Sequence, residues 1–348
     1  MKFKAAVLYE QNKPLVIEEL ETQALGQGQV LVKILYSGVC QTQVNEVKGI
    51  KGPDKYIPHC LGHEASGIVQ EIGPGVTRIR HGDYVVLSWI KGPGLEVPSM
   101  QYLRGATKIN AGAVTTFSTF SVVSENRITK VSKEVPADVA ALLGCAVPTG
   151  AGMVKNTLKA EPGSSIAIFG LGGVGLSAIM FASAIGCGKI IAVDILDSKL
   201  ELAKKFGATH VINSANEQAL EKIRALTGGL TGSGVDYAIE SSGVKEVMEL
   251  AFEAVRFGGT AVLAGNIRKG DKVGVDPYAL IHGKKIIGTW GGETRTDEDI
   301  PFYAELYLQG KFRVDQLITH TYKLEDINAA FAELKTGAVG RALIKLND

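Results

Sequence analysis

The sequence of 348 residues lacks the features of a secreted, membrane-bound or nucleic-acid-binding protein. Its four cysteines are too few for a disulfide framework in a chain of this length. Basic and acidic residues number 37 and 36, so the net charge of +1 gives no electrostatic reason to expect nucleic acid or a membrane as partner. There is no apolar run of about 18 residues, and the N-terminus is β-like instead of a signal peptide. We therefore expect a cytoplasmic protein in a reduced compartment, which suits thiolate ligands.

The length and the apolar content indicate an α/β protein with two domains. A chain of 348 residues is too long for one ordinary core, and 45% hydrophobic residues can fill two. Residues 1 to about 150 are rich in strand patterns and turn clusters, whereas strand and helix patterns alternate from about 160 to 288. This alternation predicts a doubly wound parallel sheet in the second region.

Two cysteines and one histidine have the character of a catalytic zinc site. Cys40 lies in the segment GVCQT, His63 in GHE and Cys145 in GC. Two thiolates and one imidazole are ligands that Zn²⁺ prefers, and three protein ligands leave a fourth position open for water or substrate. The alternative is that both cysteines are simply buried, as free cysteines often are.

A glycine motif after an apolar segment predicts a dinucleotide site. The strand-like run 165–169 leads into Gly170-Leu171-Gly172-Gly173-Val174-Gly175, and a helical pattern follows. Such glycines let backbone N–H groups reach a pyrophosphate at a helix N-terminus. We expect further strands at 189–194, 210–212, 235–239 and 260–264, and helices near 173–186, 197–206, 216–227 and 244–256.

The end of the second strand favours NAD over NADP. Asp194 lies about 20 residues beyond the glycine motif, where a carboxylate binds the adenine ribose and would repel a 2′-phosphate. Ile195 and Leu196 offer no arginine for that phosphate. Lys199 can contact the ribose edge, although a lysine on an exposed helix is more often solvated.

With these motifs in place, the chain resembles the zinc-dependent alcohol dehydrogenases of the medium-chain dehydrogenase/reductase superfamily. The resemblance runs nearly end to end and includes LGHEASGIVQEIGPGVTRIRHGDYVV, AALLGCAVPTGAG, FGLGGVGL and ITHTYKLEDINAAFAELKTGAVGRALI. It implies a GroES-like β-rich catalytic domain (1–150), an NAD-binding Rossmann domain (151–288) and a return to the catalytic domain (289–348). It also implies a homodimer or homotetramer, with the sheet edge near 273–288 as the contact.

The resemblance also implies roles for individual residues. Thr42 matches the hydroxyl that takes the proton from the substrate alcohol, and Glu64 matches an acidic residue beside the zinc. Thr149 and Val174 match positions that press on the nicotinamide ring. Arg341 matches an arginine that reaches the cofactor phosphates.

The chain departs from the family at a cysteine-rich lobe. Many members bind a second, structural zinc there through four closely spaced cysteines, but none occurs between Cys60 and Cys145. We therefore expect one catalytic zinc per subunit and no structural zinc. Cys60, three residues before His63, is interpreted as a structural thiol.

Three polar residues near Cys40 also depart from the family. Gln43 replaces an aspartate that orients the zinc-ligand histidine, so it lacks the charge that raises imidazole basicity. Gln41 stands at a position that is often Arg or His. Asn45 replaces the histidine that ends the proton relay, and an amide does not titrate.

The substrate is predicted least well. By resemblance the pocket includes Trp89, Phe117 and Asn266, with Trp290 nearby; the aromatic residues could equally be core residues. A buried amide at Asn266 requires hydrogen-bonding partners, which points to a sugar, polyol or cyclitol. We expect a zinc- and NAD-dependent dehydrogenase acting on a small-molecule alcohol or carbonyl. The alternatives are a zinc-free quinone or enone reductase of the same superfamily and a non-catalytic nucleotide-binding protein.

Overall fold

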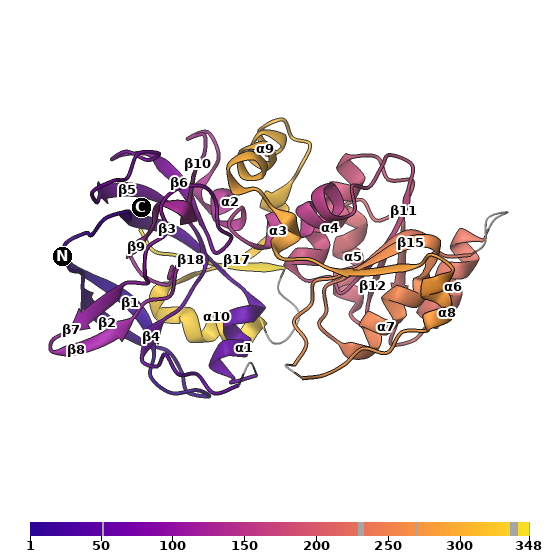
Figure 1. Ribbon diagram of the computed structural model, residues 1–348, viewed down its shortest axis with the longest axis horizontal. Coiled ribbons are helices and arrows are strands. Elements are labelled where there is room, and N and C mark those ends of the chain that lie inside the picture. Colours follow the sequence, from indigo (N-terminus) through magenta and orange to yellow (C-terminus); the bar gives the residue numbers. More distant parts are fainter. Residues whose placement is uncertain (51, 229–232, 269, 335–339, 348) are drawn as a thin grey trace. The chain divides into compact units, whose positions relative to one another are not determined.

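The computed structural model describes residues 1–348 except 51, 229–232, 269, 335–339 and 348, and its chain divides into two compact units (Figure 1). The first unit comprises 1–145, 295–310 and 314–348, and the second comprises 146–294 and 311–313. The sequence placed the borders after 150 and 288. The second unit therefore also includes the helix that follows Cys145.

The first unit is built from strands, as its turn-rich sequence indicates. Five strands close a barrel, in the order β1 (Lys2–Leu8), β2 (Val16–Glu21), β7 (Gln101–Arg104), β8 (Thr107–Asn110) and β4 (His59–Cys60). A second sheet runs β10 (Ile128–Lys130), β6 (Tyr84–Ser88), β5 (Glu64–Ile72), β3 (Gln29–Val39), β18 (Arg341–Lys345) and β17 (Ile318–Lys323), while β9 (Phe120–Ser124) also pairs with β3. Pairing of β18 with β3 places the C-terminal region beside the segment that leads to Cys40.

Short helices join and cover these strands. They are α1 (Gln41–Val47), α2 (Ala137–Leu142), α9 (Thr296–Leu308) and α10 (Ile327–Leu334), with helical turns at Glu125–Arg127, Val314–Leu317 and Leu324–Asp326. The apolar face of α10 contributes Ile327, Ala330 and Phe331 to a core that includes Phe117. Burial of such side chains stabilises the unit by about 1.5–3 kcal/mol each.

The second unit is a doubly wound parallel sheet, which confirms the predicted fold class. Its strand order is β13 (His210–Asn213), β12 (Lys189–Asp194), β11 (Ser165–Phe169), β14 (Val235–Glu240), β15 (Val255–Leu263) and β16 (Lys285–Gly288). Neighbouring strands are parallel. The order reverses between β11 and β14, and ligands of such sheets bind at this point, beyond the carboxyl ends of the strands.

Four helices of the second unit lie close to their expected positions: α4 (Gly173–Ala184), α5 (Asp197–Lys205), α6 (Ala219–Thr227) and α7 (Lys245–Ala254). Two further helices, α3 (Ala146–Gly152) and α8 (Pro277–Ile281), were not predicted, and helical turns lie at Met153–Thr157 and Gly291–Glu293. One boundary was wrong: residues 255–256 were expected to end a helix, but they begin β15. Val255 pairs with Val235 of β14, so tertiary pairing overrides the local helical pattern.

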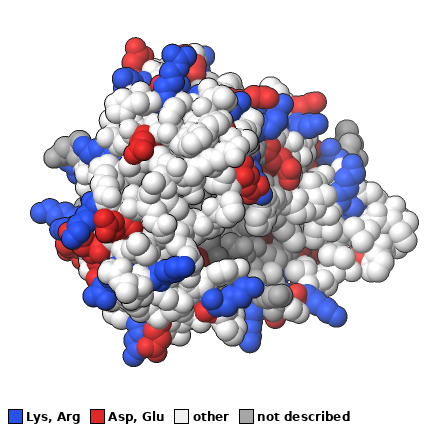
Figure 2. Space-filling view, turned by 60° about the vertical axis from the view of Figure 1, so that its left-hand side comes forward, with Lys and Arg blue, Asp and Glu red and all other residues white. Residues whose placement is uncertain are grey.

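Charged groups of both signs are interspersed on the face shown in Figure 2, without a large patch of one sign. This distribution agrees with the near-neutral net charge. No helix among the described residues is both long and apolar enough to cross a membrane.

Candidate active site

Three potential zinc ligands converge within the first unit. Cys40 caps the N-terminus of α1 directly after β3, His63 immediately precedes β5, and Cys145 ends a turn after α2. Their ligand atoms all lie within 4.8 Å of one another, and His63 Nε2 is 3.2 Å from Cys145 Sγ. This is the donor set of an open catalytic zinc site.

Gln43 connects two of these ligands. The first turn of α1 brings its side chain back to the cap, where Oε1 accepts a hydrogen bond from the Cys40 N–H at 3.2 Å. The amide nitrogen contacts His63 Nδ1. The side chain is 2% exposed, so it is held in place. Gln43 therefore contacts the histidine at the position of the family's orienting aspartate, but the contacting nitrogen is a donor and cannot accept an Nδ1–H as a carboxylate does.

Glu64 and Arg341 form a buried ion pair beside the thiols. Arg341 donates a hydrogen bond from Nη2 to Glu64 Oε1. Arg341 is 4% exposed and Glu64 is 0% exposed. Burial raises the pKa of Glu64, and Arg341 opposes that shift. Burial alone would lower the pKa of Arg341, but Glu64, Cys40 and Cys145 raise it above its ordinary value. Glu64 Oε2 and Arg341 Nε have no partner among the described residues, so the pair retains capacity for a ligand.

Two glycines make room for the Glu64 side chain. A Cβ atom at Gly38 would lie 2.6 Å from Glu64 Oε1, and one at Gly144 would lie 2.8 Å from Glu64 Cβ and 2.4 Å from the Leu87 carbonyl oxygen. Both contacts are closer than non-bonded atoms allow. The glycines of GVC and GC therefore have a steric role next to each cysteine ligand.

Cys40 is the more acidic of the two thiols in the cluster. A hydrogen bond from Cys145 lowers the pKa of Cys40, with a further contribution from His63, and the same bond raises the pKa of Cys145. By contrast, burial alone raises the pKa of Cys60 to about 12. Because the thiolate is the metal ligand, Cys40 is prepared for coordination. Cys60 is 2% exposed and packs in a hydrophobic core cluster outside the ligand group, which supports its interpretation as a structural thiol.

Trp89 contacts the cluster directly. Its indole Nε1 donates to Cys145 Sγ at 3.2 Å. The buried Arg127 donates to the Trp89 carbonyl oxygen and lies 3.4 Å from Glu96, which fixes the backbone at this point. Phe117 is different: it is fully buried and packs edge-on against Phe331, with ring centroids 5.8 Å apart. Its proposed place in the substrate pocket is not supported, because its ring belongs to the core.

Thr42 and Asn45 lie on α1, which begins at the metal cluster. Both are half-buried, and Asn45 Oδ1 accepts a hydrogen bond from Gln41 Nε2 at 2.9 Å. Thr42 lies two residues beyond the ligand Cys40, in the first turn of the helix.

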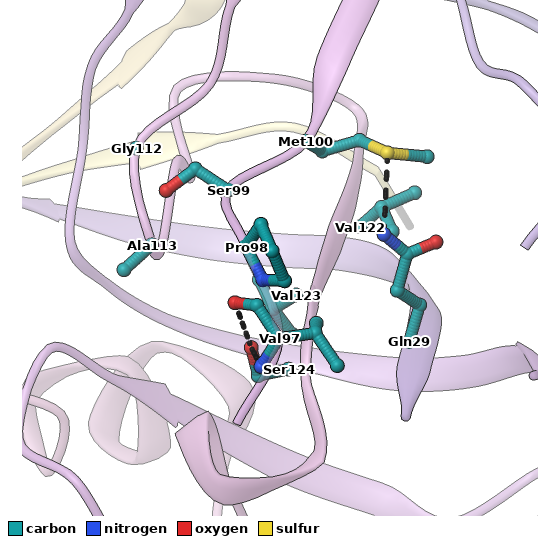
Figure 3. A pocket seen from close by; sticks show the side chains of 10 residues that line it. All are labelled: Gln29, Val97, Pro98, Ser99, Met100, Gly112, Ala113, Val122, Val123 and Ser124. Carbon is teal, nitrogen blue, oxygen red and sulfur yellow. Dashed lines mark hydrogen bonds between the residues drawn. The ribbon is translucent and has the colours of Figure 1, made fainter. Parts of the chain in front are cut away.

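The segment 90–113 has no cysteines and is held by ordinary packing. The hairpin β7–β8 occupies part of it, and Figure 3 shows the preceding residues packed against Gln29 and strand β9. Gln29 Nε2 donates to Met100 Sδ at 3.5 Å, and the Val97 N–H donates to Ser124 Oγ at 3.1 Å. The cavity there is about 10 Å³, which leaves room for about one water molecule. These side-chain contacts hold the segment against strand β9.

In the second unit, the predicted nucleotide motif forms the turn between β11 and α4. A Cβ atom at Gly172 would meet nothing within 4 Å, so the loop has an open cradle for a ligand. A Cβ atom at Gly175 would lie 2.0 Å from the Gly170 carbonyl oxygen, so the helix can approach the loop only with glycine there. Gly173 and Val174 begin α4, whose N-terminal N–H groups suit a pyrophosphate.

Asp194 ends β12 beside this loop. Its Oδ2 accepts from the Leu171 N–H at 2.7 Å, and its Oδ1 accepts from Ile195 and Leu196. Lys199, predicted to contact the ribose, is 7% exposed and is therefore not the solvated surface lysine that was the alternative. Burial lowers its pKa, and the nearby Asp194 opposes the shift. The two side chains therefore lie together, as a ribose site would require.

Other predicted contacts of the second unit differ in exposure. The Thr149 hydroxyl is buried and has no partner among the described residues, which is the state of a group that could receive a ligand. Trp290 is 76% exposed. Asn266 is also exposed, so the argument from a buried amide was wrong. The sequence alone does not indicate whether the side chain of Asn266 faces solvent.

Two contacts of the site were missed by the sequence analysis. The Glu64–Arg341 pair joins residues separated by 277 positions, and only the pairing of β18 with β3 brings them together. The indole bond from Trp89 to Cys145 also depends on tertiary structure. No local sequence pattern signals either contact.

Comparisons with known proteins agree for both units. The alcohol dehydrogenase GroES-like domain matches residues 26–133, and the zinc-binding dehydrogenase domain matches 173–306. Alcohol dehydrogenase class-3 of Pisum sativum is 36% identical, over 99% of this chain and 98% of the relative. S-(hydroxymethyl)glutathione dehydrogenase of Synechocystis sp. is 35% identical, over 99% of this chain and 100% of the relative.

Solved structures give the same result. Benzyl alcohol dehydrogenase from Acinetobacter calcoaceticus has a TM-score of 0.91 and 34% identity, with 100% of both chains covered. An alcohol dehydrogenase zinc-binding domain protein from Burkholderia ambifaria also has a TM-score of 0.91, with 33% identity and 100% coverage of both chains.

Proposed function

Because this chain belongs to the zinc-dependent alcohol dehydrogenase family, we propose that it is a zinc- and NAD-dependent dehydrogenase that interconverts an alcohol and the corresponding aldehyde or ketone. The observation that carries the proposal is the convergence of Cys40, His63 and Cys145. A zinc-free reductase has no need of this donor set. The residues fit Zn²⁺ in number and in chemical type.

Each group of the first unit has a distinct task in this proposal. Zinc held by the three ligands would polarise the substrate oxygen and lower the pKa of the alcohol toward neutrality. The Thr42 hydroxyl receives the alcohol proton, and Gln43 orients His63. Glu64 with Arg341 supplies a paired charge beside the ligands. Asn45 cannot accept the proton as an imidazole would.

The second unit supplies the binding groups for NAD, which would accept the hydride. The open cradle at Gly172 and the N-terminus of α4 suit the pyrophosphate, and Asp194 with Lys199 suits the adenine ribose. Thr149 and Val174 contact the nicotinamide ring. Arg341 lies in the first unit and is buried in its ion pair with Glu64, so its contact with the cofactor phosphates stays a prediction from the family resemblance. The Asp194 carboxylate favours NAD, because it would repel a 2′-phosphate.

For the substrate, Trp89 favours an alcohol with an apolar or aromatic substituent. Its indole contacts the ligand Cys145 and therefore borders the open metal position. A sugar, polyol or cyclitol loses its main support, because Asn266 is exposed. Among the relatives, one is named for benzyl alcohol and one for S-(hydroxymethyl)glutathione, so both compounds belong in a substrate panel.

We also propose a homodimer or homotetramer that uses the β16 edge of the sheet. This strand is the last in the sheet order, and nearby apolar side chains are exposed, including Tyr278 at 63% and Ile281 at 81%. Exposed apolar groups beside a sheet edge are typical of a contact between chains.

The test is elemental analysis combined with NADH absorbance over a panel of primary, aromatic and polyhydroxy alcohols. One zinc per subunit and NAD⁺ reduction with an alcohol would support the proposal. Zinc-free protein that reduces quinones or enones would favour the reductase, and nucleotide binding without turnover would favour a non-catalytic protein. Two tightly held zincs would contradict the argument from segment 90–113.

A further inference from the structure

A second group of potential metal ligands lies in the first unit, in the chain between Cys40 and His63. Glu46 is on α1, Asp54 is in the following loop, and His59 begins β4; both elements are labelled in Figure 1. One ligand atom from each lies within 4.8 Å of the others. The side chains of His59 and Asp54 are 7% exposed, so this is not a group of solvated surface charges.

The hydrogen bonds of His59 fix the direction of its free lone pair. Nδ1 lies 2.8 Å from the Cys60 carbonyl oxygen, which can only accept, so Nδ1 carries a hydrogen. Nε2 lies 2.7 Å from Asp54 Oδ2. This is an ordinary hydrogen-bond distance, so a proton joins the two atoms when no ion is bound. A divalent cation would replace that proton and bind both atoms side by side. A backbone carbonyl bound to the second ring nitrogen is also the usual arrangement of a metal-ligating histidine.

The loop that carries Asp54 is held in place by other contacts. Asp54 Oδ1 accepts the Tyr56 N–H at 2.8 Å. Gln11 accepts the Asp54 N–H at 3.3 Å through Oε1, and its Nε2 donates to the carbonyl oxygens of Gly52 at 3.0 Å and Glu46 at 3.4 Å. One amide therefore ties the backbone of Glu46 to the backbone of Asp54. The ligand groups are brought together before any ion binds.

The donor set suits a divalent cation in chemical type. Two carboxylates match the charge of such an ion, and the imidazole would bind it through Nε2 once the shared proton is released.

The site also has room for additional ligands. Glu46 and His59 line a cavity of about 530 Å³, together with Ser99, Gln101 and Asn110. Three protein donors beside this cavity leave positions for coordinated water. Imidazole and carboxylate donors without sulfur suit Mn²⁺, Zn²⁺ or Co²⁺, whereas soft ions prefer thiolates.

We propose that Glu46, Asp54 and His59 form a second, exchangeable site for a divalent first-row metal ion. It is chemically distinct from the Cys40–His63–Cys145 site and independent of the structural zinc of the cysteine-rich lobe. Because the loop joins the segments that carry Cys40 and His63, a bound ion also stabilises the connection between two ligands of the first site.

The test is a titration of zinc-loaded, dialysed protein with Mn²⁺, followed by electron paramagnetic resonance of the free ion. Mn²⁺ should not displace zinc from thiolates, so binding reports the second site. We expect one Mn²⁺ per subunit. Glu46→Gln and His59→Gln should each weaken binding at least about tenfold, because loss of a ligand exceeds the roughly 10–100-fold effect of losing an outer-shell partner. The control is His81→Gln, since His81 is exposed and its Nδ1 also contacts a carbonyl oxygen.

Thermal unfolding separates loss of binding from loss of folding. Added Mn²⁺ should raise the Tm of the unsubstituted protein in a concentration-dependent way, and it should raise that of Glu46→Gln much less. Glu46 is half-buried on α1, so this variant retains folding if the buried His59→Gln does not. Absence of saturable Mn²⁺ binding, or equal binding by Glu46→Gln, would show that His59 and Asp54 share only a proton and would overturn the proposal.

Discussion

The two candidate sites of this protein are built by opposite means. In the first unit, side chains from separate strands and helices converge, and buried charges such as Glu64 and Arg341 surround the ligands. In the second unit, the binding surface is a turn of backbone, in which glycines keep a cradle open at Gly172 and a tight contact at Gly175.

The difference shows where each site is vulnerable. A side-chain site fails when a functional group is removed, and nearby glycines matter because they make room for those groups. A backbone site fails when atoms are added, because an extra Cβ atom blocks either the ligand or the packing.

The largest effect should come from removing a ligand of the first site. Cys145→Ala should abolish zinc binding and reduce kcat/KM for alcohol oxidation by at least about 10³-fold, beyond the roughly 10–100-fold effect of losing an outer-shell partner. Binding of NADH, measured by fluorescence, should persist, because its groups lie in the second unit. Cys187→Ala is the control and should retain zinc and activity. Zinc-loaded, active Cys145→Ala protein would refute the assignment.

The glycine loop should respond to added atoms in two distinguishable ways. Gly175→Ala places Cβ 2.0 Å from the Gly170 oxygen, so it should destabilise the fold by about 1–3 kcal/mol and weaken NADH binding about 100-fold or more. In Gly172→Ala the added Cβ atom has no neighbour within 4 Å in the free protein, so the Tm should be nearly unchanged. The same atom occupies the ligand cradle, so NADH binding should be weaker. Fluorescence titration and thermal unfolding measure the two effects. Tight NADH binding by Gly172→Ala would place the pyrophosphate elsewhere.

The same contrast explains how much the sequence could predict. The parallel sheet and the glycine turn can be predicted from local sequence patterns. The three metal ligands can likewise be proposed from short sequence motifs, without knowledge of the tertiary structure. The Glu64–Arg341 pair depends on the pairing of β18 with β3, and the strand at Val255 depends on β14. Exposure of Asn266 and burial of Lys199 depend on how loops and helices pack. The sequence thus predicts the chemical type of each local motif, but it does not predict which distant residues are in contact or which side chains are exposed.

A single side chain in the backbone-built site should determine cofactor choice. The unsubstituted protein should prefer NAD, and Asp194→Asn should narrow that preference roughly tenfold, which corresponds to about 1.4 kcal/mol. Relief of charge repulsion toward the 2′-phosphate is the cause. The one oxygen of asparagine can keep the hydrogen bonds from Ile195 and Leu196, while the bond from Leu171 is lost, so the loop is disturbed less than by glycine. Values of kcat/KM for both cofactors test this, and a preference of the unsubstituted enzyme for NADP would contradict it.

The smallest effect concerns the proton path along α1. Thr42 can pass the alcohol proton onward, but Asn45 cannot collect it, so Asn45→His should raise oxidation rates. We expect a gain of roughly a few-fold, well below the roughly 10²–10⁴-fold of a direct acid–base catalyst, because histidine would assist only the last transfer. A neutral imidazole accepts the proton, so the gain should appear above the ordinary histidine pKa of about 6.5 and vanish below it. Thr42→Ala should be much more damaging, since it removes the first transfer. The pH–rate profiles of the three proteins give the answer. If Asn45→His leaves the profile unchanged and Thr42→Ala is harmless, the proton leaves by a route that involves neither residue.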